Sequence, residues 1–96
     1  MLPSEVLERY GISYNKGHDV PRADGTNIEQ HIYESPRAKA IVSHVTKGKK
    51  KASLVEVRII TWERSLFGKV KPNERIKPKY LKGEEVQDYI LGWLGE

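Results

Sequence analysis

The run from Leu54 to Trp62 limits the folds open to this chain more than any other part of the sequence. Six of its nine residues are β-branched or aromatic, an enrichment that is typical of a half-buried β-strand. Successive side chains of a strand point to opposite faces of its sheet. The two predicted faces consist of Val55, Val57, Ile59 and Thr61, and of Glu56, Arg58, Ile60 and Trp62. The first face predicts a side packed in the core, whereas the second is mixed.

A second strand-like run precedes this one, and together they predict a β-hairpin. We expect strands at Ala38–Thr46 and Ala52–Arg64, joined by a turn at residues 47–51 that is mostly lysine. Residues 65–68, Ser-Leu-Phe-Gly, predict a further turn whose two apolar side chains anchor it. Because two strands alone are only marginally stable in water, the sheet needs a third strand.

Residues 27–35 can supply that third strand, although a helix is the alternative. Thr26 and Glu29 match a capping box, which would start a helix here. Against this, Ile28 and Ile32 lie on one side of an alternating pattern, as they would in a strand. We favour the strand, which gives a three-stranded antiparallel meander.

Short helices are expected near both ends of the sequence. Ser4 would cap the first helix and Gly11 would end it. The second has apolar residues at the spacing of one helical face, namely Val86, Tyr89, Ile90, Trp93 and Leu94. Residues 13–27 predict mostly loop, and residues 69–82 an extended basic segment. The predicted fold class is α+β: a small antiparallel sheet centred on a long β-hairpin, with an N-terminal helix and a C-terminal amphipathic helix.

The length and composition predict one domain, 1–96, without a membrane segment. A chain of 96 residues is too short for two separate cores. It contains no cysteine, which excludes disulfides and thiolate–zinc sites and fits a cytoplasmic protein. Its apolar runs are too short to cross a bilayer, and the first residues lack the pattern of a signal peptide, so we expect no membrane partner.

The charge of the chain is strongly segregated. Residues 37–82 contain fourteen lysines or arginines and three glutamates, a net charge of +11. The remaining residues contain three bases and ten acids, a net charge of −7. A molecule with a basic and an acidic side attracts polyanions, which favours nucleic acid as the partner. Basic loops that neutralise acidic helices within the fold are the alternative interpretation.

The basic residues form three groups that predict contacts with phosphates. They are a lysine-rich turn, a strand face on which an aromatic side chain lies between arginines, and an extended basic arm. In that order, the groups are Lys47, Lys49, Lys50 and Lys51; Arg58, Trp62 and Arg64; and Lys69, Lys71, Lys77 and Lys79. Exposed lysines also keep sheet edges from aggregating. We expect non-catalytic nucleic-acid binding, with DNA or RNA, and single or double strands, left open.

A protein partner is the alternative hypothesis. The basic face would then dock an acidic or nucleic-acid-bearing complex, and the chain would act as a protein-interaction module, either an inhibitor or an accessory factor. The apolar stripe of the C-terminal helix would serve a homodimer or partner interface if the chain itself did not bury it.

One short segment resembles an enzyme motif. Glu56-Val57-Arg58, in an apolar strand, resembles the E-x-K element of restriction-endonuclease-like nucleases, in which the acid holds a metal ion. Arginine stands where that family has lysine, and no aspartate occurs between Asp24 and Glu56. Histidines 18, 31 and 44 match no metal-ligand spacing. The sequence therefore predicts no catalytic residue, no metal and no cofactor.

Overall fold

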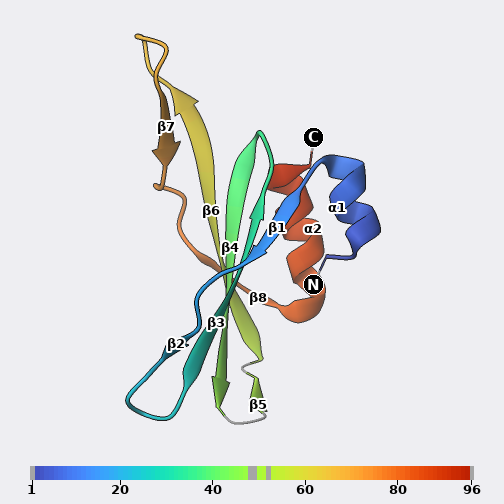
Figure 1. Cartoon of the computed structure of the whole chain (residues 1–96), viewed down its shortest axis with the longest axis vertical. Coiled ribbons are helices and arrows are strands. Elements are labelled where there is room, and N and C mark those ends of the chain that lie inside the picture. The colour runs from blue at the N-terminus through green and yellow to red at the C-terminus, as the bar shows by residue number, and fades with distance from the viewer. Residues whose placement is uncertain (1, 48–49, 52, 96) are drawn as a thin grey trace.

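The computed structural model describes residues 2–47, 50–51 and 53–95, and this part of the chain contains two helices and eight strands of one antiparallel sheet (Figure 1). The molecule measures 47 × 30 × 19 Å. The elements are α1 (Ser4–Tyr10), β1 (Ser13–Lys16), β2 (Val20–Pro21), β3 (Asn27–Glu34), β4 (Ala38–Lys47), β5 (Lys50–Lys51), β6 (Leu54–Arg64), β7 (Val70–Asn73), β8 (Lys79–Lys82) and α2 (Gly83–Leu94). The predicted α+β class is confirmed.

The longest strands lie at the centre of the sheet. The strand order is β1-β3-β4-β6-β7, and beside this path β2 pairs with β3, β5 with β4, and β8 with β6. Residues 27–34 form a strand, as predicted, so β3, β4 and β6 make the expected meander. β6 is eleven residues long, and the edge that faces away from β4 pairs with β8 near its start and with β7 near its end.

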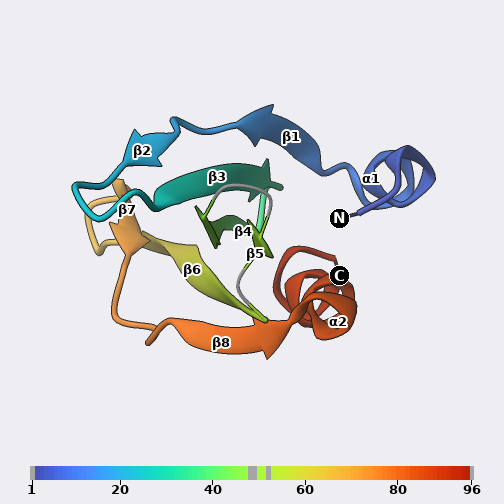
Figure 2. The same cartoon turned by 90° about the horizontal axis from the view of Figure 1, so that it is seen from below.

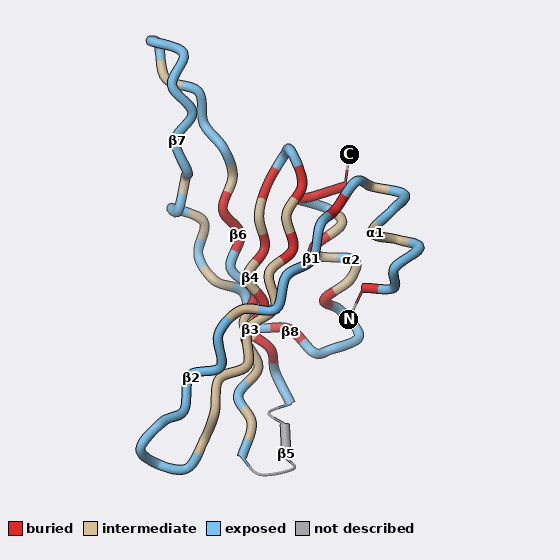
Figure 3. The backbone as a smooth tube through the Cα atoms, in the orientation of Figure 1, coloured by how far each residue is buried: buried red, intermediate tan, exposed pale blue. Residues whose placement is uncertain are grey.

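The core lies between the sheet and the two helices, which are on the same side of it (Figure 2). Val55, Val57 and Ile59 of β6 are buried there, as the alternation predicts (Figure 3). They belong to one apolar cluster with Ile90 and Leu94 of α2. Burial of these side chains supplies the main favourable term in folding. The helices therefore close one face of the sheet and leave the other uncovered.

The start of α1 differs from the prediction, and its end agrees with it. Ser4 is the first helical residue; the N-cap is Pro3, which has no side-chain cap bond, and its carbonyl accepts the amide hydrogens of the first turn. Gly11 adopts a φ of 63°, and the Ile12 N–H donates to the Leu7 carbonyl at 2.9 Å. This is the bond of a Schellman motif, which ends the helix as expected.

The C-terminal end of α2 is tied to the turn between β3 and β4. The Ser35 hydroxyl donates to the Leu94 carbonyl, and the Arg37 guanidinium donates to the Gly95 carbonyl, both at 2.9 Å. These bonds satisfy carbonyl groups that the end of a helix leaves without intrahelical partners. Arg37 belongs to the basic segment identified in the sequence, and its hydrogen bond to Gly95 stabilises the fold.

The apolar stripe of α2 is buried within the chain only in part. Val86, Ile90 and Leu94 are buried, and Tyr89 is partly buried, but Trp93 keeps 36% of its surface exposed. The packing of this stripe against the core side of the sheet is therefore incomplete at Trp93. The buried residues are spaced four apart, and the two aromatic residues lie along one edge of that row. No helix in the described part of the chain is long and apolar enough to span a membrane.

Two segments in which no strand was predicted, one expected to be mostly loop and one an extended basic segment, contain short edge strands. Residues 13–27 include β1 and β2, and residues 69–82 include β7 and β8. All four residues of β1 are exposed, so its pairing with β3, and not an apolar pattern of its own, makes it a strand. Pro72 fits within β7 because an edge strand can leave one side of its backbone without ladder bonds.

Candidate nucleic-acid interface

The face of the sheet that points away from both helices is the candidate interface, and we call it the open face. Strand alternation and register place on it every second residue of each central strand. Its members are Ile28, Gln30, Ile32 and Glu34 of β3; Lys39, Ile41, Ser43, Val45 and Lys47 of β4; Leu54, Glu56, Arg58, Ile60, Trp62 and Arg64 of β6; Val70 and Pro72 of β7; and Tyr80 and Lys82 of β8. It combines five cations with two acids, Glu34 and Glu56, and with aromatic and apolar side chains.

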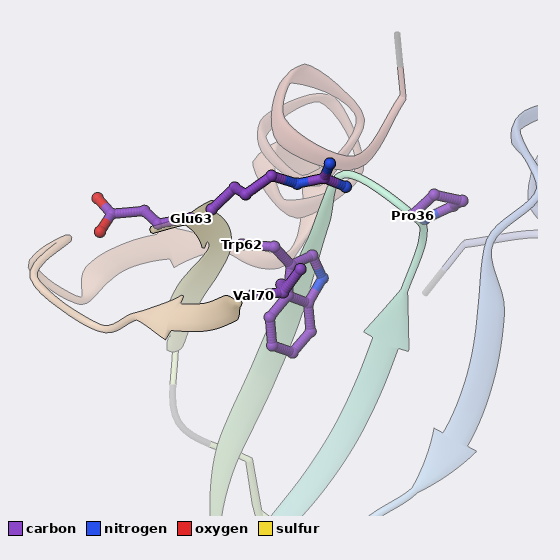
Figure 4. A pocket seen from close by; sticks show the side chains of 5 residues that line it. Pro36, Trp62, Glu63 and Val70 are labelled. Carbon is purple, nitrogen blue, oxygen red and sulfur yellow. The ribbon is translucent and has the colours of Figure 1, made fainter. Parts of the chain in front are cut away.

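The strand-face residues predicted from the sequence, Arg58, Trp62 and Arg64, all lie on the open face and are exposed. Trp62 therefore does not pack under α2, which covers the other face. Its indole, 36% exposed, helps to line a pocket of about 430 Å³ with Pro36, Arg64, Val70 and a neighbouring residue of β6 (Figure 4). An open aromatic ring beside a guanidinium can stack on a base and contact a phosphate.

The acidic residue at this pocket is turned away from its aromatic wall. In Figure 4 the Glu63 side chain points in the opposite direction from Trp62 and Val70. Glu63 Oε1 accepts a hydrogen bond from Asn73 Nδ2 at 2.8 Å, which joins β6 to β7. The carboxylate is thus held on the other side of the β6–β7 hairpin. Its electrostatic repulsion of an anion bound at the pocket is weaker there than it would be beside the indole.

A second pocket of about 350 Å³ lies in the middle of the open face. It is lined by Arg22, Ile28, Gln30, Ser43, Val45, Leu54, Glu56 and Tyr80. The Tyr80 hydroxyl donates to Glu56 Oε2 at 3.1 Å. This hydrogen bond, and then the charge of Glu56, raise the pKa of Tyr80 above its ordinary value of 10. Glu56, the acid of the nuclease-like segment, is therefore occupied by a phenol in this structure.

The predicted lysine turn is described only in part. Lys49 lies outside the described residues, and only the backbone of Lys50 and Lys51 is described; it forms β5, which pairs with Thr46 and Lys47 of β4. Lys47 is exposed. The β6–β7 turn lies at the opposite end of the long axis of the molecule from β5 (Figure 1). The structure thus separates the lysine turn from the start of the basic arm.

The basic arm is divided between two environments. Lys69 and Lys71 are exposed on the β6–β7 hairpin, and Lys77 is exposed in the connection to β8. Lys79 lies elsewhere, because its Nζ is 5.2 Å from the centre of the Tyr89 ring of α2, on the helix side of the sheet. This cation–π contact ties β8 to α2. Lys79 is therefore not brought to the open face.

Three exposed apolar or aromatic residues near this surface, Leu66, Phe67 and Tyr80, are not among the predicted site residues. Leu66 and Phe67, expected to anchor their turn, are 102% and 92% exposed and anchor nothing. The available signal was the pair of large apolar residues at a turn, bounded by Arg64 and Lys69. Tyr80, the third exposed aromatic of this surface, falls in a segment that showed no strand pattern.

A separate polar cluster lies on the helix side, between β1 and β3. The Tyr14 hydroxyl is 2.6 Å from His31 Nδ1, and His31 Nε2 is 3.3 Å from Glu29 Oε1. The rings of His31 and His44 lie 6.0 Å apart, whereas His18 is in the loop after β1. Within the described ranges, no group of three His, Cys, Asp or Glu side chains is placed to hold a metal ion.

Comparison with protein-family models, with curated proteins and with solved structures finds no match for this chain.

Proposed function

We propose that this chain binds nucleic acid without acting on it chemically, through the open face and the β6–β7 hairpin. The observation that carries the proposal is the exposed indole of Trp62 beside Arg64, in a pocket on a sheet face that neither helix covers. Stacking on bases and charge-assisted bonds to phosphates use these two groups. Arg58 and Lys82 add positive charge along the same face.

The proposed contacts are of a kind that DNA and RNA share. Phosphates carry no sequence information, and an aromatic ring can stack on any base. We therefore expect weak sequence preference together with strong dependence on salt, because cations that bind phosphates release condensed counterions. We place this activity in the cytoplasm, which the absence of cysteine favours.

Fluorescence anisotropy with single- and double-stranded DNA and RNA, at several salt concentrations, tests the proposal. The logarithm of the affinity should fall linearly with the logarithm of the salt concentration. Replacing Arg58 and Arg64 together by glutamine should make the slope for duplex DNA shallower by about 2. Arg9→Gln, at an exposed arginine of α1, is the matched control and should leave the slope unchanged. Wild-type affinity that ignores salt would contradict the proposal.

A protein partner for the open face is the second candidate, and the apolar side chains there favour it. Val45 and Leu54 are exposed, and Ile28 and Ile41 are only partly buried. Exposed apolar patches mark interaction surfaces. Light scattering separates the two functions: if a second copy covers this face, the wild type is a dimer without nucleic acid, and Leu54→Lys makes it a monomer. A monomeric wild type that binds nucleic acid excludes that dimer.

A further inference from the structure

The β6–β7 hairpin presents two large apolar side chains at its tip. Leu66 and Phe67 are 102% and 92% exposed, so neither contributes packing to the fold. A defined turn holds them in place: the Ser65 N–H donates to the Lys69 carbonyl at 2.8 Å, and the Gly68 N–H donates to the Ser65 carbonyl at 3.0 Å. Gly68 adopts a φ of 79°, which an L side chain rarely permits. The apolar pair is thus fixed at the apex of the turn.

The hairpin projects as a two-stranded ribbon beyond the rest of the sheet. The pairing of β4 with β6 ends at Ala38 opposite Thr61, and from Thr61 to Arg64 β6 continues with β7 (Figure 1). Four residue pairs give the ribbon a length of about 13 Å before the turn. The hydrogen bond between Asn73 and Glu63 braces its base. The tip can therefore enter a groove while the sheet remains outside it.

Positive charge surrounds the apolar tip. Arg64, Lys69 and Lys71 are exposed on the ribbon, and its acidic residue, Glu63, is engaged by Asn73. A grooved polyanion whose interior is apolar complements a tip of this kind. Duplex nucleic acid has both properties, because phosphates line its grooves and stacked bases fill its centre. β-Ribbons of DNA-binding proteins enter the major or the minor groove, and apolar wedges act from the minor groove.

We propose that Leu66 and Phe67 act as a wedge that enters between neighbouring base pairs of a duplex, while Arg64, Lys69 and Lys71 bind the flanking phosphates. This inference rests on the proposed function and adds a mode of binding to it. Apolar wedges of Phe or Leu partly unstack a base step and kink the duplex. Steps that unstack easily, such as TA and CA, should be preferred sites.

A lipid surface is the other ligand that an apolar tip with cations could meet, and the overall charge distribution disfavours it. A bilayer would meet only the end of the molecule that carries the tip. Exposed basic residues continue along the open face at Arg58 and reach Lys47, beside β5 at the opposite end (Figure 1). A duplex that is kinked at the tip can bend back along this path and meet more of the protein surface, whereas a planar surface at the tip cannot.

The test compares the wild type with the double variant Leu66→Ser, Phe67→Ser on a duplex that carries 2-aminopurine at a central TA step and a fluorophore pair at its ends. The wild type should raise the 2-aminopurine signal and shorten the end-to-end distance. The variant should lose both effects, and its affinity for the duplex should fall by about tenfold. The slope of its log affinity against log salt concentration should equal that of the wild type, because the variant keeps Arg64, Lys69 and Lys71. Trp93→Ser, at an exposed aromatic residue of α2 on the other side of the sheet, is the matched control and should behave as the wild type on the duplex.

The double variant should fold like the wild type, because both side chains are almost fully exposed. Equal melting temperatures of the two proteins will verify this. Unchanged 2-aminopurine signals in the double variant would overturn the wedge while leaving salt-dependent binding intact. Absence of duplex binding by the wild type would instead remove the proposed function as well. Wild-type binding to vesicles of phosphatidylserine that the double variant loses, without any duplex kink, would also overturn the wedge in favour of a membrane contact.

Discussion

Replacing Trp62 by alanine is the sharpest single test of the open face. If the indole stacks on a base, its loss should cost about 1–3 kcal/mol of binding free energy, which is roughly a 5- to 150-fold loss of affinity. Trp62 is not part of the apolar cluster under the helices, so the free energy of unfolding should fall by only about 1 kcal/mol. Binding should therefore change far more than stability.

The chain offers a matched control for this substitution. Trp93 has the same exposed fraction, 36%, but belongs to α2 on the other side of the sheet, and Trp93→Ala should leave the affinity unchanged. The chain has only these two tryptophans, so Trp93→Phe makes Trp62 the sole reporter. Titration of this variant with a single-stranded oligonucleotide should quench its fluorescence, because a stacked base contacts the ring directly.

The outcome that refutes this reasoning is specific. If Trp62→Ala binds as tightly as the wild type while Trp93→Ala does not, the contact surface is on the helix side and the open face has another use. Equal losses in both variants, together with lowered melting temperatures, would show that binding followed general stability rather than a stacking contact.

Three further predictions concern the core, the open face and the lysine turn. Ile90→Ala should destabilise the fold by about 2–5 kcal/mol, and Trp93→Ala by much less, in chemical denaturation, since Ile90 is 0% exposed. Glu56→Gln should lower the pKa of Tyr80 towards 10, measured by an absorbance titration of the phenolate. Because the pKa of Tyr80 is raised in the folded state, the hydrogen bond between Tyr80 and Glu56 stabilises the wild type below pH 10. This stabilisation is lost as the pH rises through the folded-state pKa. Replacing Lys49, Lys50 and Lys51 together by glutamate should lower the affinity for duplex DNA in the anisotropy assay. It should leave the melting temperature nearly unchanged, because exposed charges contribute little to folding stability.

The central strands could be predicted from the sequence because one face of each lies against the core and the other points away from it, which favours alternating apolar and polar residues. Residues 54–62 alternate between core and open face, so Val55 and Val57 were identified as buried, and Arg58 and Trp62 as lying on the other side. The helix end at Gly11 was equally visible, since a left-handed residue there is a local requirement. Such features depend on neighbours in the sequence and on one flat surface.

The short edge strands and the hairpin tip could not be predicted in this way. β1 is exposed at all four residues and exists because β3 pairs with it, which is information held elsewhere in the chain. Phe67 was expected to anchor its turn because apolar side chains are usually buried, yet much of a protein's surface is apolar and the converse does not hold. Ser4 was expected as a cap, whereas the helix begins one residue earlier than that assignment requires.

The positions of the lysines and arginines in the structure decide which of them are available to a ligand. Arg37 is bonded to the carbonyl of Gly95, and Lys79 lies over the ring of Tyr89, so these two cations serve the fold. Four exposed cations in the described part of the chain lie on the open face between the β6–β7 hairpin and the end of β4 that pairs with β5, namely Arg64, Arg58, Lys82 and Lys47. A ligand that reaches both ends must extend along a molecule 47 Å long, which corresponds to about 14 base pairs of B-form DNA at 3.4 Å each. A compact anion would neutralise only one part of that path, and an extended polyanion is the ligand that can follow all of it.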